Sequence, residues 1–445
     1  MKFPLAVIGL AFALVHASTA ADWPQFRGPQ ASGVDSSAAL PTTWNVESGS
    51  NVLWKTAVPG LAHAAPIVSG DRVYLATTVG AGDADLKVGL YGDIGAADDQ
   101  GVRQWRLLSL EAGSGRIVWD KLGHQGVPRV KRHTKASHCN STPATDGKRI
   151  VAIFGSEGLF CFDLQGELLW KKDLGPMDSG FFAVPSAQWG FASSPVLHDD
   201  KVVVLCDVQT NSFIAVFDAS DGRELWRTER KDVPTWGSPT IASVGGKAQI
   251  LVNGWHHSGA YDFATGKEIW RHDGGGDIPT PTPIIGDGLA YFTSAHGRFR
   301  PMQAVRLDAK GDITASEMGA TNAGIAWSHA RKGNYMQTPI LVGDLLYGCN
   351  DNGVLTCFDA KTGEIQFEER LRAGGDGFTA SPVSDGRHLF FPSEQGDVYV
   401  VRAGRQFAIV SSNAMNETIM ASPALSGGRL FLRTRGQLVA MGANR

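Results

Sequence analysis

The chain has 445 residues, and 41 Lys and Arg against 44 Asp and Glu give it a formal net charge of −3. This near balance argues against nucleic acid as a partner, because surfaces that bind nucleic acid are strongly basic. A content of 54 Gly and 12 Trp in a chain that is 43% hydrophobic is typical of a turn-rich β protein with a large core.

Residues 1–20 have the pattern of an export signal. Lys2 precedes an apolar run, and Ser18 and Ala20 are small residues placed for cleavage after Ala20. No Cys follows that site, so no lipid anchor is indicated, and no later apolar run reaches the roughly 18 residues of a membrane helix. We therefore expect a soluble protein without membrane insertion, periplasmic or secreted after cleavage near Ala20.

A small or hydroxyl residue followed by Pro, a short apolar stretch, a Gly/Asp turn and a β-rich run recurs eight times. The core spacing of roughly 40–45 residues is typical of one four-stranded propeller blade. Pro is tolerated where a strand begins, so each should mark the start of an innermost strand. The sequence thus predicts an all-β fold, a single eight-bladed β-propeller of four-stranded antiparallel blades over residues 21–445. The prolines are Pro66, Pro143, Pro195, Pro239, Pro283, Pro339, Pro382 and Pro423.

A second signature, an acid, a turn containing Gly and then a Trp, closes most blades. Asp218, Gly222 and Trp226 show it clearly. The Gly should open the hairpin before the outermost strand, and the Trp should dock on the neighbouring blade, where burial of roughly 150–250 Å² of ring would join the two blades. Variants run from Glu111 to Trp119, Asp163 to Trp170, Asp262 to Trp270, and Asp359 to Phe367.

The last blade lacks a fourth strand. After Pro423 there is room only for strands over residues 430–434 and 437–441. Residues 51–54 resemble an outermost strand carrying Trp54, yet no blade precedes them. Because an unpaired edge must be covered, we expect this N-terminal strand to pair with the last blade and close the ring.

Residues 78–105 form a loop insertion in the first blade. Its acids offer either a calcium site or a plain flap, and the order of ligands found in EF-hands is missing. Long loops on rigid scaffolds often carry function. The acids are Asp83, Asp85, Asp93, Asp98 and Asp99.

The Asp-x-x-x-Gly-x-x-x-Trp repeat and the segment from Trp23 to Pro29 resemble the PQQ-binding-like β-propeller repeat proteins, a family of exported bacterial proteins. The resemblance covers the whole mature chain. More distantly the chain is similar to quinoprotein alcohol dehydrogenases, which bind PQQ with calcium on the propeller axis, and to the outer-membrane assembly lipoprotein, a protein-binding scaffold. It lacks the adjacent cysteines of the former and the lipidated cysteine of the latter. The resemblance therefore suggests PQQ with calcium as a cofactor, without specific residues for it.

The position of each segment within the repeat predicts where it lies in the propeller. The segments that enter the innermost strands, and the loops between the second and third strands, should gather at one mouth of the central channel. Aromatic, imidazole and basic groups gather in these segments, which makes this mouth the candidate ligand-binding site. We name no catalytic residue and no metal ligand. The candidate residues are His63, Arg132, His133, His138, Asn140, Trp189, Trp236, His256, His296, Arg298, Tyr335 and Gln337.

Each candidate has a second interpretation. Trp189 and Trp236 either stack on a planar or sugar ring or pack between blades. The pair from His256 to His257 either holds a ligand or lies solvated on a loop. The basic residues from Lys131 to His138 either form an anion-binding rim or are a solvated loop balanced by the acids of residues 83–99. Cys349 and Cys357 either form a disulfide or are core residues.

Three functions remain open on the sequence. The first is a ligand-binding or protein-interaction scaffold that acts through the channel mouth on a small molecule or an envelope protein, as a monomer. The second is a PQQ-dependent oxidoreductase, and the third is carbohydrate binding or processing. Neither a nucleophile elbow nor a phosphate loop occurs in the sequence.

Overall fold

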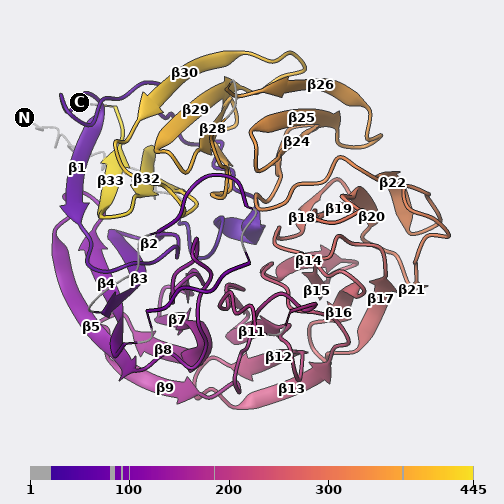
Figure 1. Ribbon diagram of the computed structural model, residues 1–445, viewed down its shortest axis with the longest axis horizontal. Helices are drawn as coiled ribbons and strands as arrows, with labels where there is room; N and C mark the ends of the chain where they lie inside the picture. Colours follow the sequence, from indigo (N-terminus) through magenta and orange to yellow (C-terminus); the bar gives the residue numbers. More distant parts are fainter. Residues whose placement is uncertain are drawn as a thin grey trace, which may run out of the picture.

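The computed structural model describes residues 22–80, 86–91, 94–99, 101–184, 186–372 and 375–443. The expected export signal and the acids Asp83, Asp85 and Asp93 lie outside the described residues. Eight antiparallel sheets stand around a central axis, so the predicted eight-bladed β-propeller is confirmed (Figure 1). No helix in the described ranges is long and apolar enough to cross a membrane.

The blades follow one another in chain order. Blade 1 is β2 (Ile67–Ser69), β3 (Arg72–Gly80), β4 (Arg103–Glu111) and β5 (Ile117–Gly126); blade 2 is β6 (Ala144–Thr145), β7 (Arg149–Ile153), β8 (Leu159–Asp163) and β9 (Leu168–Lys172). Blade 3 is β10 (Val196–His198), β11 (Lys201–Cys206), β12 (Phe213–Asp218) and β13 (Glu224–Glu229); blade 4 is β14 (Thr240–Val244), β15 (Lys247–Val252), β16 (Ser258–Asp262) and β17 (Glu268–His272).

The second half of the ring repeats the plan. Blade 5 is β18 (Ile284–Gly286), β19 (Leu289–Thr293), β20 (Met302–Arg306) and β22 (Ile325–His329), and the short β21 (Gly311–Asp312) joins blade 4 instead. Blade 6 is β23 (Ile340–Val342), β24 (Leu345–Cys349), β25 (Val354–Asp359) and β26 (Ile365–Arg370); blade 7 is β27 (Val383–Ser384), β28 (His388–Pro392), β29 (Asp397–Arg402) and β30 (Ile409–Ala414). Blade 8 is β31 (Ala424–Ser426), β32 (Arg429–Arg433), β33 (Gln437–Met441) and β1 (Val52–Ala57). Two 3-10 turns complete the described elements: η1 (Pro29–Ala31) and η2 (Gly155–Glu157).

The eight prolines lie where the repeat predicts. Pro66 directly precedes β2, Pro382 directly precedes β27, and the other six stand in the same position before the first strand of their blades. Pro lacks an N–H, and at this position no bond of the sheet is lost. The prolines therefore mark the residue at which the first strand of each blade begins.

The N-terminal strand closes the ring, as predicted. β1 pairs antiparallel with β33, with Val52 opposite Met441 and Ala57 opposite Gln437. Figure 1 shows the two strands side by side at the seam between the chain ends. Trp54 is buried, and its indole Nε1–H donates to the Ala112 carbonyl of blade 1 at 3.1 Å. Blade 8 is thus completed by residues from the opposite end of the chain.

Trp and Gly of the second signature meet across five of the eight junctions. Trp170 Nε1 donates to the Ala219 carbonyl at 3.0 Å, and the Trp170 ring lies directly over Gly222, where a Cβ would be only 2.6 Å from it. Gly222 also has a φ of +70°. The Gly is therefore required twice, for its backbone conformation and for the close approach of the ring. Equivalent indole bonds join Trp119 to Leu164, Trp226 to Phe263, and Trp327 to Ala360.

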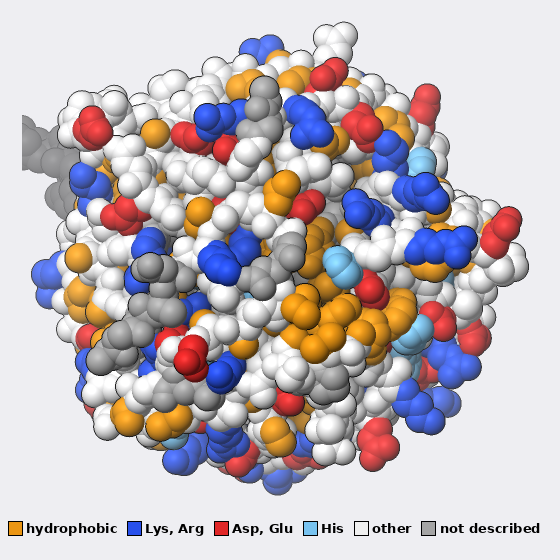
Figure 2. Space-filling view, in the orientation of Figure 1, with side chains coloured by type: hydrophobic (Ala, Val, Ile, Leu, Met, Phe, Trp, Pro, Cys, Tyr) orange, Lys and Arg blue, Asp and Glu red, His pale blue; other side chains and the backbone are white. Residues whose placement is uncertain are grey.

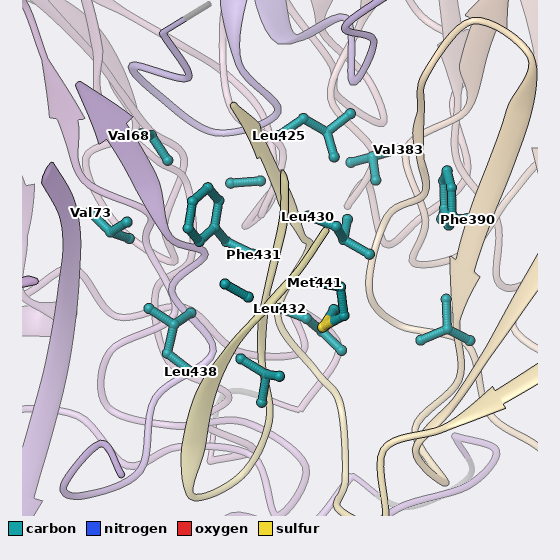
Figure 3. Packing of buried hydrophobic residues seen from close by; sticks show 14 of the residues in the cluster. Val68, Val73, Val383, Phe390, Leu425, Leu430, Phe431, Leu432, Leu438 and Met441 are labelled. Atoms are coloured by element: carbon teal, nitrogen blue, oxygen red, sulfur yellow. The ribbon is translucent and has the colours of Figure 1, made fainter. Parts of the chain in front are cut away.

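The core is built at these junctions. In Figure 3, Phe431 and Leu438 of blade 8 lie toward Val68 and Val73 of blade 1, while Leu430 of blade 8 lies toward blade 7. All of these side chains belong to one buried cluster. The inner strands of each blade bury both faces, so strands such as β11 and β12 read as nearly continuous apolar runs.

The cysteines are core residues. All five are buried and free, so Cys349 and Cys357 form no disulfide. Burial raises the pKa of the Cys161 thiol to about 12, which keeps it protonated and unreactive at neutral pH.

Candidate ligand-binding site

A cavity of about 430 Å³ lies on the propeller axis. Its size falls within the roughly 300–1,000 Å³ of ordinary small-molecule sites. The residue before the strand-opening Pro of blades 2 to 8 lines it in every case, which centres the cavity on the axis. These residues are Thr142, Ser194, Ser238, Thr282, Thr338, Ser381 and Ser422.

These seven side chains form a hydroxyl ring that links the blades. Each oxygen accepts the backbone N–H of the equivalent residue in the preceding blade, at 2.9–3.0 Å; Thr142 N–H, for example, donates to Ser194 Oγ. The chain of bonds starts at Ala65 of blade 1, whose N–H donates to Thr142 Oγ1. The other links join Ser194 to Ser238, Ser238 to Thr282, Thr282 to Thr338, Thr338 to Ser381, and Ser381 to Ser422.

The hydroxyl ring also supplies donors to the cavity. An incoming N–H occupies one lone pair of each oxygen, while the O–H proton of each of the seven has no acceptor among the described residues. The geometry of the oxygens is fixed by the blades. A polar ligand would therefore meet donors whose positions are set before it arrives.

An N-terminal segment closes the opposite end of the channel. Phe26 lines the cavity, and the fully buried Arg27 donates to the carbonyls of Pro382 at 2.7 Å and Pro339 at 3.0 Å. Figure 1 shows the following turn, η1, as an indigo ribbon close to the ring centre. Burial lowers the pKa of Arg27 to about 9, which still leaves it charged at neutral pH. The cavity thus has a floor.

Aromatic rings from blades 3 and 4 form one wall. Trp189 and Trp236 have ring centroids 5.6 Å apart, and Phe181 stacks on Trp189 at 5.5 Å and 11°. Both indole N–H groups are bound by backbone, Trp236 to Gly190 at 2.9 Å and Trp189 to Ile94 at 3.2 Å. These bonds hold the rings in place, so the wall offers ring surface rather than N–H donors.

The adjoining wall, from blades 5 and 6, carries ionisable groups, and the ring centroid of His296 lies 6.0 Å from that of Phe181. His296 Nδ1 lies 2.9 Å from Asp277 Oδ1, and its imidazole stacks on Tyr335 at 5.8 Å and 25°. His296 has a φ of +85°, a strained conformation of the kind that gathers at functional sites. Burial raises the pKa of Asp351 at this wall, and the charge of Arg300, also in the lining, acts against that rise.

Part of the insertion in blade 1 crosses the mouth. Tyr91 lies against Tyr335, with ring centroids 5.2 Å apart, and Lys135 Nζ lies 3.8 Å above the Tyr91 ring. Lys135 also pairs with the buried Glu394 at 2.9 Å, and Gly89 N–H donates to that same carboxylate at 2.7 Å. Contacts to blade 7 therefore hold this segment against the cavity that Tyr91 lines.

Asp99 of the insertion is the centre of a buried charge network. Its carboxylate contacts Arg132 at 2.6 Å, Arg103 at 3.1 Å and His138 at 3.2 Å. Hydrogen bonds from His138 and the charge and hydrogen bond of Arg132 outweigh burial and hold the pKa of Asp99 well below its usual range. Arg132 and His138 therefore anchor the insertion, which agrees with the second of the two interpretations, a loop balanced by the acids of residues 83–99. Lys131 pairs with Asp98 at 3.2 Å.

Seven of the twelve predicted residues line the cavity. They are His63, His133, Asn140, Trp189, Trp236, His296 and Tyr335. Gln337 is buried and donates to the Ala380 carbonyl at 2.7 Å. His256 and Arg298 are exposed, and neither belongs to the lining. Together with Arg132 and His138, these make five predicted residues that do not belong to the cavity lining.

The sequence did not single out Phe26, Tyr91, Phe181 or Arg300 as site residues, although all four line the cavity. None stands at a fixed position of the repeat, so repeat phase could not find them. The hydroxyl ring did leave a signal, the small or hydroxyl residue before each Pro. The sequence could not show the role of these residues, because each hydroxyl accepts a hydrogen bond from the backbone of the adjacent blade.

Known proteins resemble this chain in both sequence and fold. A match to the family described as outer membrane protein assembly factor BamB covers residues 34–181 and 106–369. BamB of Shewanella oneidensis is 22% identical over 298 residues, 63% of this chain and 68% of that protein. Tetrathionate hydrolase of Acidithiobacillus ferrooxidans is 25% identical over 284 residues, 56% of this chain and 52% of that protein, so the chain spans about half the length of this relative.

Solved structures show the same fold. BamB from Moraxella catarrhalis has a TM-score of 0.54 at 16% identity and covers 82% of this chain and 100% of that one. A europium-containing methanol dehydrogenase has a TM-score of 0.63 at 13% identity, covering 95% of this chain and 89% of that one. At such identities the likeness concerns the fold alone.

Proposed function

This chain belongs to the family of outer membrane protein assembly factor BamB, and from that scaffold we propose a ligand-binding propeller that takes a small molecule into its covered axial cavity. One observation carries the proposal. Stacked rings on one wall, ionisable groups on the adjoining wall and the hydroxyl ring converge on a cavity of about 430 Å³. Such a mixture of flat apolar surface and a few placed polar groups is typical of small-molecule sites.

The closed ends favour a small molecule over a partner chain within the channel. Phe26 and Arg27 fill one end, and the segment that carries Tyr91 crosses the other. A polypeptide threaded along the axis would have to displace both. We further propose, from the leader-like residues 1–20, that the protein works in the periplasm or outside the cell. From its nearly balanced charge we propose that nucleic acid is not a partner, and we expect a monomer.

The quinone alternative receives no support from the described residues. An o-quinone cofactor with calcium needs several oxygen ligands for the metal, with carboxylates among them. Asp351 is the sole carboxylate in the cavity lining, and no group of three His, Cys, Asp or Glu in the described ranges could hold a metal ion. We therefore derive no redox step through that group.

Thermal unfolding against a compound set tests the proposal. The set would contain neutral and acidic sugars, aromatic acids, nucleosides, and PQQ with Ca²⁺. A ligand at about 100 times its Kd should stabilise the protein by about 2.7 kcal/mol, and Trp236→Ala should abolish that shift. Trp119→Phe, remote from the cavity, serves as the control. No shift with any compound, or shifts that survive Trp236→Ala, would contradict the proposal.

A further inference from the structure

We infer that the ligand is a neutral sugar chain, with its terminal ring in the cavity and the next rings on an aromatic strip outside it. The strip starts at Phe181, which lines the cavity, and runs outward through Phe182, Trp255 and His256. This inference rests on the proposed function and names the ligand class for the same site. Three independent observations support it: the charge balance of the lining, the pairing of ring faces with hydroxyl donors, and the continuity of the strip.

The cavity has no excess of either charge. Lys135 is paired with Glu394, and the positive charge of Arg300 acts on the carboxyl group of Asp351 in the same lining. Burial lowers the pKa of His63 to about 3, so this imidazole is neutral at ordinary pH. A charged ligand would leave one buried charge without compensation, which is strongly unfavourable. The balance therefore favours an uncharged ligand.

A sugar ring matches the remaining chemistry. Its C–H face is flat and apolar and suits the exposed face of Trp236, while its hydroxyl oxygens can accept from the hydroxyl ring below. The seven O–H donors of that ring are preplaced by bonds between blades. Ligands without oxygens at the ring edge would leave these buried donors without acceptors, at a cost of about 1–3 kcal/mol each. This excludes a purely apolar aromatic ligand.

The strip continues the cavity wall outward. From Trp189 the ring centroids follow at 5.5 Å to Phe181, 5.1 Å to Phe182 and 4.7 Å to Trp255, and His256 stacks on Trp255 at 3.9 Å. Figure 2 shows hydrophobic side chains gathered beside histidines near the centre of this face. A row of partly exposed rings that starts inside a cavity suits a chain of repeated rings better than a single small molecule.

Backbone hydrogen bonds hold the Trp255 end of the strip. The buried Asp232 carboxylate accepts the backbone N–H groups of Trp255 and His257, each at 3.0 Å. The Trp255 carbonyl in turn accepts the N–H of Gly275 at 3.0 Å. A loop held in this way keeps its ring in place before ligand binds, which reduces the entropy lost on binding.

Calorimetry with defined sugars tests the inference. The probes are α- and β-linked oligomers of glucose, mannose, galactose and xylose with one to five rings, together with galacturonic acid oligomers as the acidic match to galactose. We expect a neutral series to bind, and we expect its affinity to rise about tenfold between one ring and three. Phe182→Ala and Trp255→Ala should remove most of that rise. Phe299→Ala, which changes an exposed ring outside the strip, should keep it.

The outcomes separate the two proposals. If no neutral oligomer binds while another compound binds in a manner that requires Trp236, the sugar inference falls and the ligand-binding function stands. Tighter binding of the acidic oligomers, or affinity independent of chain length, also overturns the inference. If no compound of any class binds, both proposals fall.

Discussion

The backbone N–H of Ala65 in blade 1 donates to Thr142 Oγ1 of blade 2 at 3.0 Å, and the same relation passes from blade to blade until Ser422. Seven hydroxyls thus tie eight blades together at their innermost point. Thr142→Val keeps the shape of the side chain but leaves the Ala65 N–H without its acceptor. We expect a loss of about 1–3 kcal/mol in the free energy of unfolding, measured with urea. Thr321→Val, at an exposed Thr, should change stability little; equal losses at both sites would contradict this role.

Ala65 itself occupies the eighth position of the ring and has no oxygen to accept the N–H of Ser422. Ala65→Thr would supply one. Compared with Ala65→Val, which has the same shape without the hydroxyl, the Thr variant should be more stable by about 0.5–1.5 kcal/mol. Comparing these two variants cancels the effect of added bulk. Equal stability would show that the eighth link does not form.

Gly222 carries the contact between blades 2 and 3. In Gly222→Ala the new methyl would meet the Trp170 ring at 2.6 Å in a residue whose φ is +70°. We expect a loss of about 2–4 kcal/mol, from overpacking added to backbone strain. Gly245→Ala has a similar strain, with a φ of +56°, but no atom within 4 Å of the new Cβ, and should lose only about 1 kcal/mol. If the two variants lose the same amount, the ring contact is not what requires glycine.

Trp54 seals the ring seam. Trp54→Ala removes a buried indole that bonds to Ala112 and packs on Phe431 at 5.9 Å between ring centroids. A loss of about 3–5 kcal/mol is expected from calorimetric unfolding. Leu53→Ala, on the same strand but with an exposed side chain, should cost less than about 1 kcal/mol. Similar losses at both positions would argue against closure through Trp54.

His63 makes stability depend on pH. Burial lowers the pKa of its imidazole to about 3, below the ordinary value of 6.5. Between these values the unfolded chain binds a proton that the folded chain does not, so stability is full above about pH 6.5 and falls as the pH drops, by up to about 1.4 kcal/mol per unit. His63→Gln should flatten this fall in urea unfolding between pH 6.5 and 4.

His272 provides a comparison for that experiment. Burial also lowers the pKa of His272, which bonds to Gln303 at 3.0 Å. His272→Gln combined with His63→Gln should flatten the curve further than either change alone, because distant sites act additively. Parallel curves for the wild type and the variants would contradict the assignment.

The features that the sequence predicted correctly are those that recur in each repeat. Pro382 at a strand start and Gly222 beneath a Trp are local requirements, and both recur with the blade period. The residues of the site were harder to predict, because the ion-pair partners that determine their positions lie outside the repeat. Arg132 and His138 have the correct phase for the mouth, yet Asp99 of the insertion binds both. The partner of a buried charge in a different loop cannot be read from the period of the repeat.

Phe181 and Arg300 line the cavity, yet the sequence did not predict them as site residues. Both lie in irregular segments between blades, where no strand pattern fixes the direction of a side chain. Their convergence on the axis follows from how the ring closes. Only the hydroxyl ring combined a repeated position with a role in the site, and that role depends on a hydrogen bond to the adjacent blade.

The pairing of Val52 with Met441 has a kinetic consequence. Blades 1 to 7 can each form from neighbouring residues and stack in the order of synthesis, whereas blade 8 must join two segments that are almost the whole chain apart. Closing so long a loop is the slowest kind of contact to make, so the seam should form after the transition state for folding. Trp54→Ala should then speed unfolding and leave the folding rate nearly unchanged in stopped-flow experiments. The eighth blade would behave as a latch, whose strength sets the lifetime of the folded ring.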